Sequence, residues 1–304
     1  MAGKVVSVSL GSSRRDDRVE ATFLGKAFEI SRVGMDGDID RAEKMIRELD
    51  GKVAAIGLGG IDINLVAKGE RYVLRDGLRL KEAARVTPVV DGGGLKDTLE
   101  REAVRHLAAR VTPPLLGPPT PVLMVCALDR FGMAEALVEA GCPVVFGDLI
   151  FTMGMSYPIR SLEELAGLAK RLLPEMAKLP FNLLYPTGKE QEKPSDDRFS
   201  AYFQEATVVA GDYHYIRKYL PPEITGKTIL TQTITAADVE DLRRRGAAWL
   251  VTTTPALGGR SYATNVMEAL LVAILGKQPE EIAADDYFFL LRQLGFVPRI
   301  EKLN

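Results

Sequence analysis

Hydrophobic and polar positions in the first third of the chain predict short strands that are joined by turns and helices. Residues 4–10 alternate with a period of two, as a strand does when it buries one face. Residues 19–33 predict a hairpin that turns at Gly25–Lys26, and residues 53–58 are a continuous apolar run that is typical of a buried strand. Apolar residues at helical spacing predict a helix over residues 38–49. The pattern therefore predicts an N-terminal α/β domain with a mixed sheet.

A proline-rich stretch then divides the chain. The prolines of residues 111–121 exclude a helix or a central strand, so this stretch is predicted to link a first domain, residues 1–112, to a second, residues 121–276. In the second domain apolar runs alternate with helical segments, which is the pattern of a doubly wound, Rossmann-like parallel sheet. Its predicted strands lie at residues 121–128, 142–148, 182–186, 207–212, 228–232 and 248–254. Helices within residues 277–304 are expected to pack back on the first domain.

Composition and charge narrow the classes of partner. The 304 residues are 46% hydrophobic and 26% charged, an ordinary globular composition, and their formal net charge is -2. We therefore expect neither a nucleic-acid partner nor binding to an anionic membrane surface. The longest apolar runs are far shorter than the ~20 residues of a membrane-spanning helix, and the first residues predict a strand instead of a signal peptide, which indicates a cytoplasmic protein. The expected partner is a small-molecule substrate, and assembly into a homo-oligomer is left open.

Residues 91–97, DGGGLKD, contain the first candidate catalytic groups. Three successive glycines before a helix expose backbone N–H groups that favour an anion or a carboxylate. A lysine beside an acid in a cleft can act as a general acid and base, as the reduction of a carbonyl needs. A glycine-rich turn with solvated charges is the alternative interpretation. The candidate anion-binding residues are Gly92, Gly93 and Gly94, and the candidate catalytic residues are Lys96, Asp97 and Asp91.

The first strand–helix–strand unit of the second domain matches a nucleotide-binding fingerprint in part. A Rossmann fingerprint has three glycines as G-x-G-x-x-G and, about 20 positions on, an acidic residue that binds a ribose hydroxyl. Gly132 and Asp148 fill the last two roles, whereas Ala127 and Asp129 replace the first two glycines. The Asp129 carboxylate would repel a pyrophosphate unless Arg130 or a metal compensates for its charge. The unit predicts NAD or NADP as cofactor, and the acid at position 148 favours NAD.

Further candidates lie at other predicted strand ends. His214 follows a strand and opens a helix, so it is the alternative base, and Asp212 could orient its ring. Two histidines and two cysteines cannot supply a Cys-rich zinc site or a disulfide framework, so no metal is predicted. Charged loops of mixed sign are also typical of a solvated surface. The remaining candidates for substrate or anion binding are Ser12, Ser13, Arg14 and Arg260.

Several segments together resemble one known family. They are GSSRRDDRVE, DGGGLKDTLER, DRFGMAEALVEAGC, FGDLIF, LLYPTGKEQEK, GDYHYIRKYLP and TTTPALGGRSYATNVMEALLVA. With these segments nearly the whole chain resembles a bacterial family labelled quinate 5-dehydrogenase, which is distantly similar to shikimate and quinate dehydrogenases. The resemblance implies a substrate domain, a Rossmann domain and an NAD(P)-dependent oxidoreductase that acts on a small hydroxylated or carboxylated metabolite. Residues 252–255, TTTP, resemble the N-A-T-P strand end near the nicotinamide, which adds Thr252 and Thr253 as cofactor-binding candidates.

The sequence also departs from those dehydrogenases. The N-V-T-x-P-x-K and N-T-D segments are absent, so Lys96 and Asp97 are candidates because of their chemistry and not because of a matching motif. Two other functions therefore stay open for the cleft expected between the domains. One is a binding protein for an anionic metabolite without redox chemistry, and the other is a lyase or transferase that needs no nicotinamide.

Overall fold

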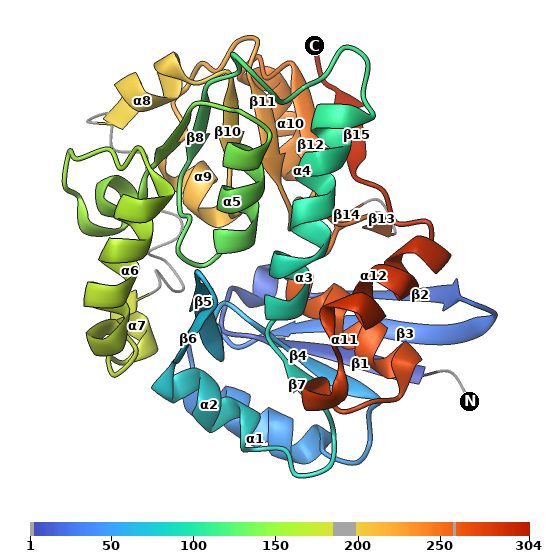
Figure 1. The fold of residues 1–304 in the computed structure, drawn as a ribbon. Helices are drawn as coiled ribbons and strands as arrows, with labels where there is room; N and C mark the ends of the chain where they lie inside the picture. The colour runs from blue at the N-terminus through green and yellow to red at the C-terminus, as the bar shows by residue number, and fades with distance from the viewer. Residues whose placement is uncertain (1–2, 185–198, 258–259) are drawn as a thin grey trace. The chain divides into compact units, whose positions relative to one another are not determined.

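The computed structural model describes residues 3–184, 199–257 and 260–304, and the chain folds as two compact α/β units (Figure 1). Unit 1 contains Met1–Leu95, Arg171–Gln191 and Ala263–Phe296. Unit 2 contains Lys96–Lys170, Glu192–Tyr262 and Val297–Asn304. Each unit has a sheet with parallel strands, so the predicted α/β class is confirmed for both.

Unit 1 has a mixed five-stranded sheet in the order β2-β3-β1-β4-β7. Its strands are β1 (Gly3–Ser9), β2 (Asp17–Phe23), β3 (Lys26–Gly34), β4 (Ala55–Gly59) and β7 (Val89–Val90). β1 is parallel to β3 and β4, and β4 is parallel to β7, whereas β2 and β3 form an antiparallel hairpin. Leu24 and Gly25, with φ of 50° and 76°, form the turn of that hairpin, as the strong twist of a two-residue turn requires. The predicted hairpin and the mixed sheet are confirmed, but the turn lies one residue before the predicted Gly25–Lys26, because Lys26 already pairs with Phe23.

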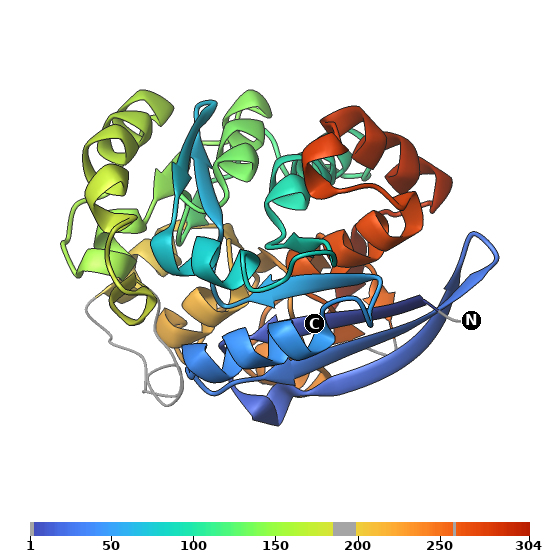
Figure 2. The ribbon, with the colours of Figure 1, turned by 90° about the horizontal axis from the view of Figure 1, so that it is seen from below.

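Helices cover both faces of this sheet (Figures 1 and 2). α1 (Ile39–Leu49) packs Ala42 and Ile46 against Val6 and Val8 of β1. α11 (Thr264–Leu275) lies on the other face, where Asn265 Nδ2 donates a hydrogen bond of 2.8 Å to Ser7 Oγ. The alternation of side chains along β1 thus explains why its even and odd positions meet different helices. The other elements of unit 1 are β5 (Asn64–Ala67), β6 (Glu70–Val73), α2 (Arg75–Lys81), α7 (Phe181–Leu184) and α12 (Ala284–Gln293), while the division between the units falls within α3 (Gly93–Asp97), after Leu95.

Gly57 of β4 lies close to the start of α11. A Cβ atom at this position would lie 2.5 Å from the carbonyl oxygen of Asn265. We expect Gly57→Ala to lower the free energy of unfolding by about 1–3 kcal/mol, because the helix must move away from the strand. Urea denaturation of both proteins measures the change. Gly25→Asn is the control, since no atom lies within 4 Å of its Cβ position and asparagine accepts the positive φ; equal stability of wild type and Gly57→Ala would contradict the prediction.

Unit 2 has a six-stranded sheet in the order β15-β12-β11-β10-β8-β9. The strands β8 to β12 are parallel, and β15 pairs antiparallel with β12. Counted along the chain from β8, the parallel strands follow the order 2-1-3-4-5 of flavodoxin-like sheets, which differs from the 3-2-1-4-5-6 order of dinucleotide-binding Rossmann sheets. The strands are β8 (Val122–Met124), β9 (Val144–Phe146), β10 (Val208–Ala210), β11 (Thr228–Thr231), β12 (Trp249–Thr252) and β15 (Arg299–Lys302).

The core on one face of the unit 2 sheet is aliphatic and aromatic. Leu123, Val209, Ile229 and Leu250 contribute one buried side chain from each of four neighbouring strands. The helices of unit 2 are α4 (Leu99–Ala109), α5 (Phe131–Glu139), α8 (Ser200–Glu205), α9 (Tyr213–Tyr219) and α10 (Ala236–Arg244), while α6 (Leu162–Met176) runs from unit 2 into unit 1. A short hairpin, β13 (Ala256–Leu257) and β14 (Arg260–Ser261), follows β12. Along the described ranges, no helix has the length and apolar character needed to cross a membrane.

The structure divides the chain differently from the predicted ranges. α4 and the proline-rich stretch belong to unit 2, because α4 packs on α5 and Arg101 and Arg105 form ion pairs with Glu135 and Glu139. Of the C-terminal residues, α12 belongs to unit 1 and β15 to unit 2. Asn182–Leu184 of the predicted strand at 182–186 is helical, as part of α7, and the rest of that predicted strand lies outside the described residues.

Candidate functional site

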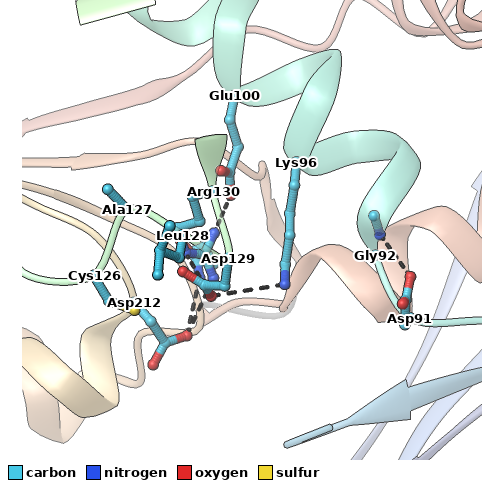
Figure 3. Close-up of polar contacts among 12 residues, drawn as sticks. Asp91, Gly92, Lys96, Glu100, Cys126, Ala127, Leu128, Asp129, Arg130 and Asp212 are labelled. Atoms are coloured by element: carbon cyan, nitrogen blue, oxygen red, sulfur yellow. Dashed lines mark hydrogen bonds and ion pairs between the residues drawn. The ribbon is translucent and has the colours of Figure 1, made fainter. Parts of the chain in front are cut away.

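A connected group of interacting charges lies at the switch point of the unit 2 sheet. The chain leaves β8 toward β9 on one side and leaves β10 toward β11 on the other, and ligands of such sheets bind where these connections part. Asp129 and Arg130 follow β8, and Asp212 follows β10. Figure 3 shows these side chains gathered beneath the start of α4.

Arg130 is at the centre of this group. Its Nη1 atom contacts Glu100 of α4, its Nη2 atom lies 3.3 Å from Asp212 Oδ2, and its Nε atom lies 3.6 Å from Asp129 Oδ2. Gln232, directly after β11, donates from Nε2 to the same Asp212 oxygen at 3.1 Å. Only 3% of the Arg130 side chain is exposed, so the guanidinium is a buried hub that connects three carboxylates.

Lys96 completes the group. Its Nζ atom lies 3.7 Å from Asp129 Oδ2, and 12% and 14% of the two side chains are exposed (Figure 3). Asp97, one of the partners expected from the sequence, instead forms an ion pair with Arg101 and is 58% exposed. Asp91, the other, accepts hydrogen bonds from the backbone of Ile63 within unit 1. The structure therefore pairs Lys96 with an aspartate that the sequence analysis had assigned to the cofactor loop.

Burial and charge act in opposite directions on the carboxylates of this group. Burial raises the pKa of Glu100 even though Arg130 and Lys96 oppose the shift. Burial also acts to raise the pKa of Asp212, but the charges of His214 and Arg130 outweigh it, so this pKa is lowered. Asp212 is therefore an anion at neutral pH. It also caps α9, because its Oδ1 atom accepts the backbone N–H of His214 at 2.8 Å.

Asp148 does not present its carboxylate to a ligand. Its oxygens accept backbone hydrogen bonds from Ala127, at 2.9 and 3.1 Å, and from Leu128, at 2.9 Å. Burial raises the pKa of this carboxyl to about 6. Asp148 thus holds the loop after β8 in place, and a ribose hydroxyl finds no exposed oxygen on it.

Gly132 has a different role from the one its place in the fingerprint predicted. A Cβ atom there would lie 3.0 Å from the carbonyl oxygen of Lys96 and 2.9 Å from Asp97 Oδ1. The glycine therefore permits close packing of α5 against residues 96 and 97, and this packing covers the helix start that a pyrophosphate would need. NAD or NADP stays a prediction that neither Gly132 nor Asp148 supports.

The remaining candidates of unit 2 lie at the end of β12 and beyond. Thr252 Oγ1 donates to the Thr254 carbonyl and accepts from Ser261 Oγ, both at 2.9 Å, so it stabilises the turn. Thr253 is buried, and its Oγ1 atom has no hydrogen-bond partner within the described ranges. The Arg260 guanidinium stacks 4.9 Å from the centre of the Tyr262 ring.

In unit 1 the glycine-rich loop is occupied by a carboxylate of the protein itself. Glu268 of α11 accepts the N–H of Gly92 at 2.6 Å and that of Gly94 at 3.1 Å, and Asp91 Oδ1 accepts the N–H of Gly93 at 2.9 Å. Tyr287 of α12 donates to Glu268 at 2.8 Å. The expected preference of these amides for a carboxylate is met internally, by a residue far along the chain that the sequence analysis missed.

The loop after β1 is organised in the same way. Ser13 donates its backbone N–H to Asp36 Oδ1 at 2.7 Å, and Ser12 Oγ accepts the N–H of Arg14 at 3.3 Å. Arg32, which the sequence analysis did not select, donates to the Ser12 carbonyl at 3.0 Å. The candidate anion-binding residues of this loop thus mainly stabilise the loop.

The stability of unit 1 is expected to depend on pH through Glu268. Burial and the nearby Asp91 raise the pKa of Glu268 to about 7 from 4.5, so the folded state binds its proton more tightly than the unfolded state does. The stabilisation of the folded state that comes from this tighter proton binding is fully present below about pH 4.5. It is lost as the pH rises through about 7, and the total loss is up to about 3 kcal/mol. Thermal unfolding from pH 5 to 8 should show that slope in the wild type and a flatter profile in Glu268→Gln. Identical profiles would contradict this assignment.

A protein-family model matches more than half of the chain. Residues 94–303 match "Domain of unknown function (DUF8754)", which is well over half of the 304 residues. The chain belongs to the DUF8754 family. Residues 4–91 match a second model, "Domain of unknown function (DUF8753)". All the residues of the switch-point group, Lys96, Glu100, Asp129, Arg130, Asp212 and Gln232, lie inside the DUF8754 match.

Comparison with solved structures finds only distant likenesses. The chain is similar to an ABC transporter solute binding protein from Burkholderia multivorans, with 14% identity, 99% of this chain and 100% of that chain covered, and a TM-score of 0.41. It is similar to a putative malic enzyme, with 14% identity, 96% and 84% covered, and a TM-score of 0.36. A carbohydrate transporter solute binding protein from Agrobacterium radiobacter has 12% identity, 91% and 90% covered, and a TM-score of 0.36. No curated protein matches the chain significantly.

Proposed function

We propose that unit 2 binds a small hydroxylated or carboxylated metabolite at the switch point and that Lys96 and Asp129 transfer a proton at its reacting oxygen. The observation that carries this proposal is the Lys96–Asp129 pair, 3.7 Å apart and largely shielded from water at the carboxyl end of a parallel sheet. Shielding strengthens the interaction of both charges with a bound molecule.

The two side chains supply complementary halves of acid–base chemistry. The Lys96 ammonium can donate a proton to an oxygen on which negative charge develops, and the Asp129 carboxylate can accept one from a hydroxyl. Arg130 lies 3.6 Å from the same Asp129 oxygen and restricts the orientation of that carboxylate. Such a site suits a lyase or transferase step, or a binding protein that does not turn its ligand over.

An NAD(P)-dependent oxidoreductase is the second candidate. The parallel sheet and the lysine–aspartate pair favour it, because reduction of a carbonyl needs a proton donor beside the oxygen. The internal use of Gly132 and Asp148 weighs against it, so we place it below the cofactor-independent function.

A ligand screen by thermal unfolding tests the proposal. Quinate, shikimate and other hydroxylated carboxylates should raise the unfolding midpoint of the wild type, and the effect should disappear in Lys96→Met and Asp129→Asn. Lys26→Met is the control, because this exposed lysine lies at the start of β3 in unit 1. NADH and NADPH belong in the same screen. A saturable rise of the unfolding midpoint with either would favour the oxidoreductase over the cofactor-independent function. A response that survives in Lys96→Met would overturn the proposed role of the pair.

A further inference from the structure

Gln232, at the switch point, has a buried side chain of which only one end forms a hydrogen bond. Its Nε2 atom donates to Asp212, but its Oε1 atom is buried and has no hydrogen-bond partner within the described ranges. Only 1% of the residue is exposed. A buried acceptor without a donor destabilises the folded state, so stability alone does not explain a glutamine here.

The backbone after Gln232 is also unfavourable. Thr233 has a φ of 61°, in the left-handed region that a β-branched residue rarely adopts. Such a strained backbone conformation destabilises the folded state and is typically found at functional sites. Two independent costs thus fall on neighbouring residues directly after β11, on the edge of the sheet where Asp212 follows β10.

The donors and acceptors around Gln232 indicate what a ligand must bring. The Arg130 guanidinium and the Gln232 amide N–H are already directed to Asp212. Glu100 Oε2 is a second buried oxygen without a hydrogen-bond partner among the described residues. Glu100 is connected to Gln232 through Arg130 and Asp212. The buried oxygens at Gln232 and Glu100 are acceptors, so at these two positions they pair with hydroxyl donors and disfavour a second carboxylate or a phosphate.

We propose that Gln232 is a specificity-determining residue whose side-chain oxygen accepts a hydrogen bond from a hydroxyl group of the ligand. This inference rests on the proposed function, because it needs a ligand at the Lys96–Asp129 pair. It assigns the ligand to the class of polyhydroxylated metabolites, with a hydroxyl, and not an acid group, beside Gln232. Opening of the site to the ligand would let that hydroxyl replace the missing partner of Oε1.

Binding of three matched probes to purified protein tests the inference. Isothermal titration with quinate, shikimate and cyclohexanecarboxylate compares ligands with and without hydroxyl groups on one ring framework. Gln232→Met should weaken the binding of a hydroxylated probe about tenfold to a hundredfold, the equivalent of one lost hydrogen bond, and leave cyclohexanecarboxylate unchanged. Lys96→Met should weaken all three. The midpoint of thermal unfolding of Gln232→Met should stay close to that of the wild type, because removal of the unpaired acceptor offsets the loss of the Nε2 hydrogen bond to Asp212.

The possible failures are distinguishable. If Gln232→Met binds the hydroxylated probes as the wild type does while Lys96→Met does not, the inference is overturned and the proposed function stands. If Gln232→Met loses stability and keeps its selectivity, Gln232 serves the fold and the inference is again overturned. If Lys96→Met binds all three probes as tightly as the wild type, the proposed function fails, and the inference fails with it.

Discussion

Replacing Arg130 with methionine is expected to lower the free energy of unfolding by about 3–5 kcal/mol. The guanidinium contacts the fully buried Glu100, and it also lies within 3.6 Å of Asp129 and Asp212. Without Arg130 the Glu100 carboxylate would be buried without its cation. Leaving one such charge unpaired destabilises a protein far more than replacing both members of the pair does. Urea denaturation monitored by circular dichroism measures the loss.

The double variant Glu100→Gln/Arg130→Met is the matched control for this effect. It removes Arg130 together with Glu100, the fully buried carboxylate among its three partners, so it should recover part of the stability that Arg130→Met loses, although Asp129 and Asp212 still lack the arginine. If the double variant is as unstable as the single one, packing of the arginine and not its charge dominates. If Arg130→Met is as stable as the wild type, Arg130 is not the hub of the switch-point group.

Replacing Asp148 with alanine is expected to lower the free energy of unfolding by about 2–5 kcal/mol. Both oxygens of Asp148 accept backbone hydrogen bonds, and the substitution leaves the buried N–H groups of Ala127 and Leu128 without an acceptor. The loop that carries Asp129 would lose its fixed position, so ligand binding should weaken as well. Thermal and urea unfolding measure the first effect, and the probe titrations measure the second.

Asp148→Asn is the control for that prediction. It keeps one side-chain oxygen for the backbone N–H groups, so its stability should lie between those of the wild type and Asp148→Ala. A ribose-binding role predicts the opposite pattern, with unchanged stability and a loss of NAD binding alone. That result would restore the role expected for Asp148 from its position in the sequence.

Local patterns in the sequence were sufficient for much of the fold. The hairpin of β2 and β3 follows from alternation on both sides of Gly25, and the alternation of strands and helices after residue 121 indicates the parallel sheet. The same local patterns did not predict how the chain divides into two units. The proline-rich stretch is a strong local signal, but whether α4 joins one unit or the other depends on its ion pairs with α5, which periodicity does not report.

The candidate site shows the same limit. Lys96 was identified from its chemistry, but its partner Asp129 is 33 positions further on, and only the folded chain brings the two together. The amides of the glycine-rich loop were expected to attract a carboxylate, and the one that they bind is Glu268. Gln232 lay in a strand-end loop without a chemical signal of its own, since a missing hydrogen-bond partner is a property of the structure alone.

The proposed site is best tested by a crystal structure of the protein with the tightest-binding hydroxylated carboxylate. We expect the ligand within hydrogen-bond distance of Lys96 Nζ and Asp129, in unit 2 at the carboxyl ends of β8 and β10. A ligand bound elsewhere, such as at the glycine-rich loop of unit 1 in place of the Glu268 carboxylate, with the Lys96–Asp129 pair untouched, would contradict it.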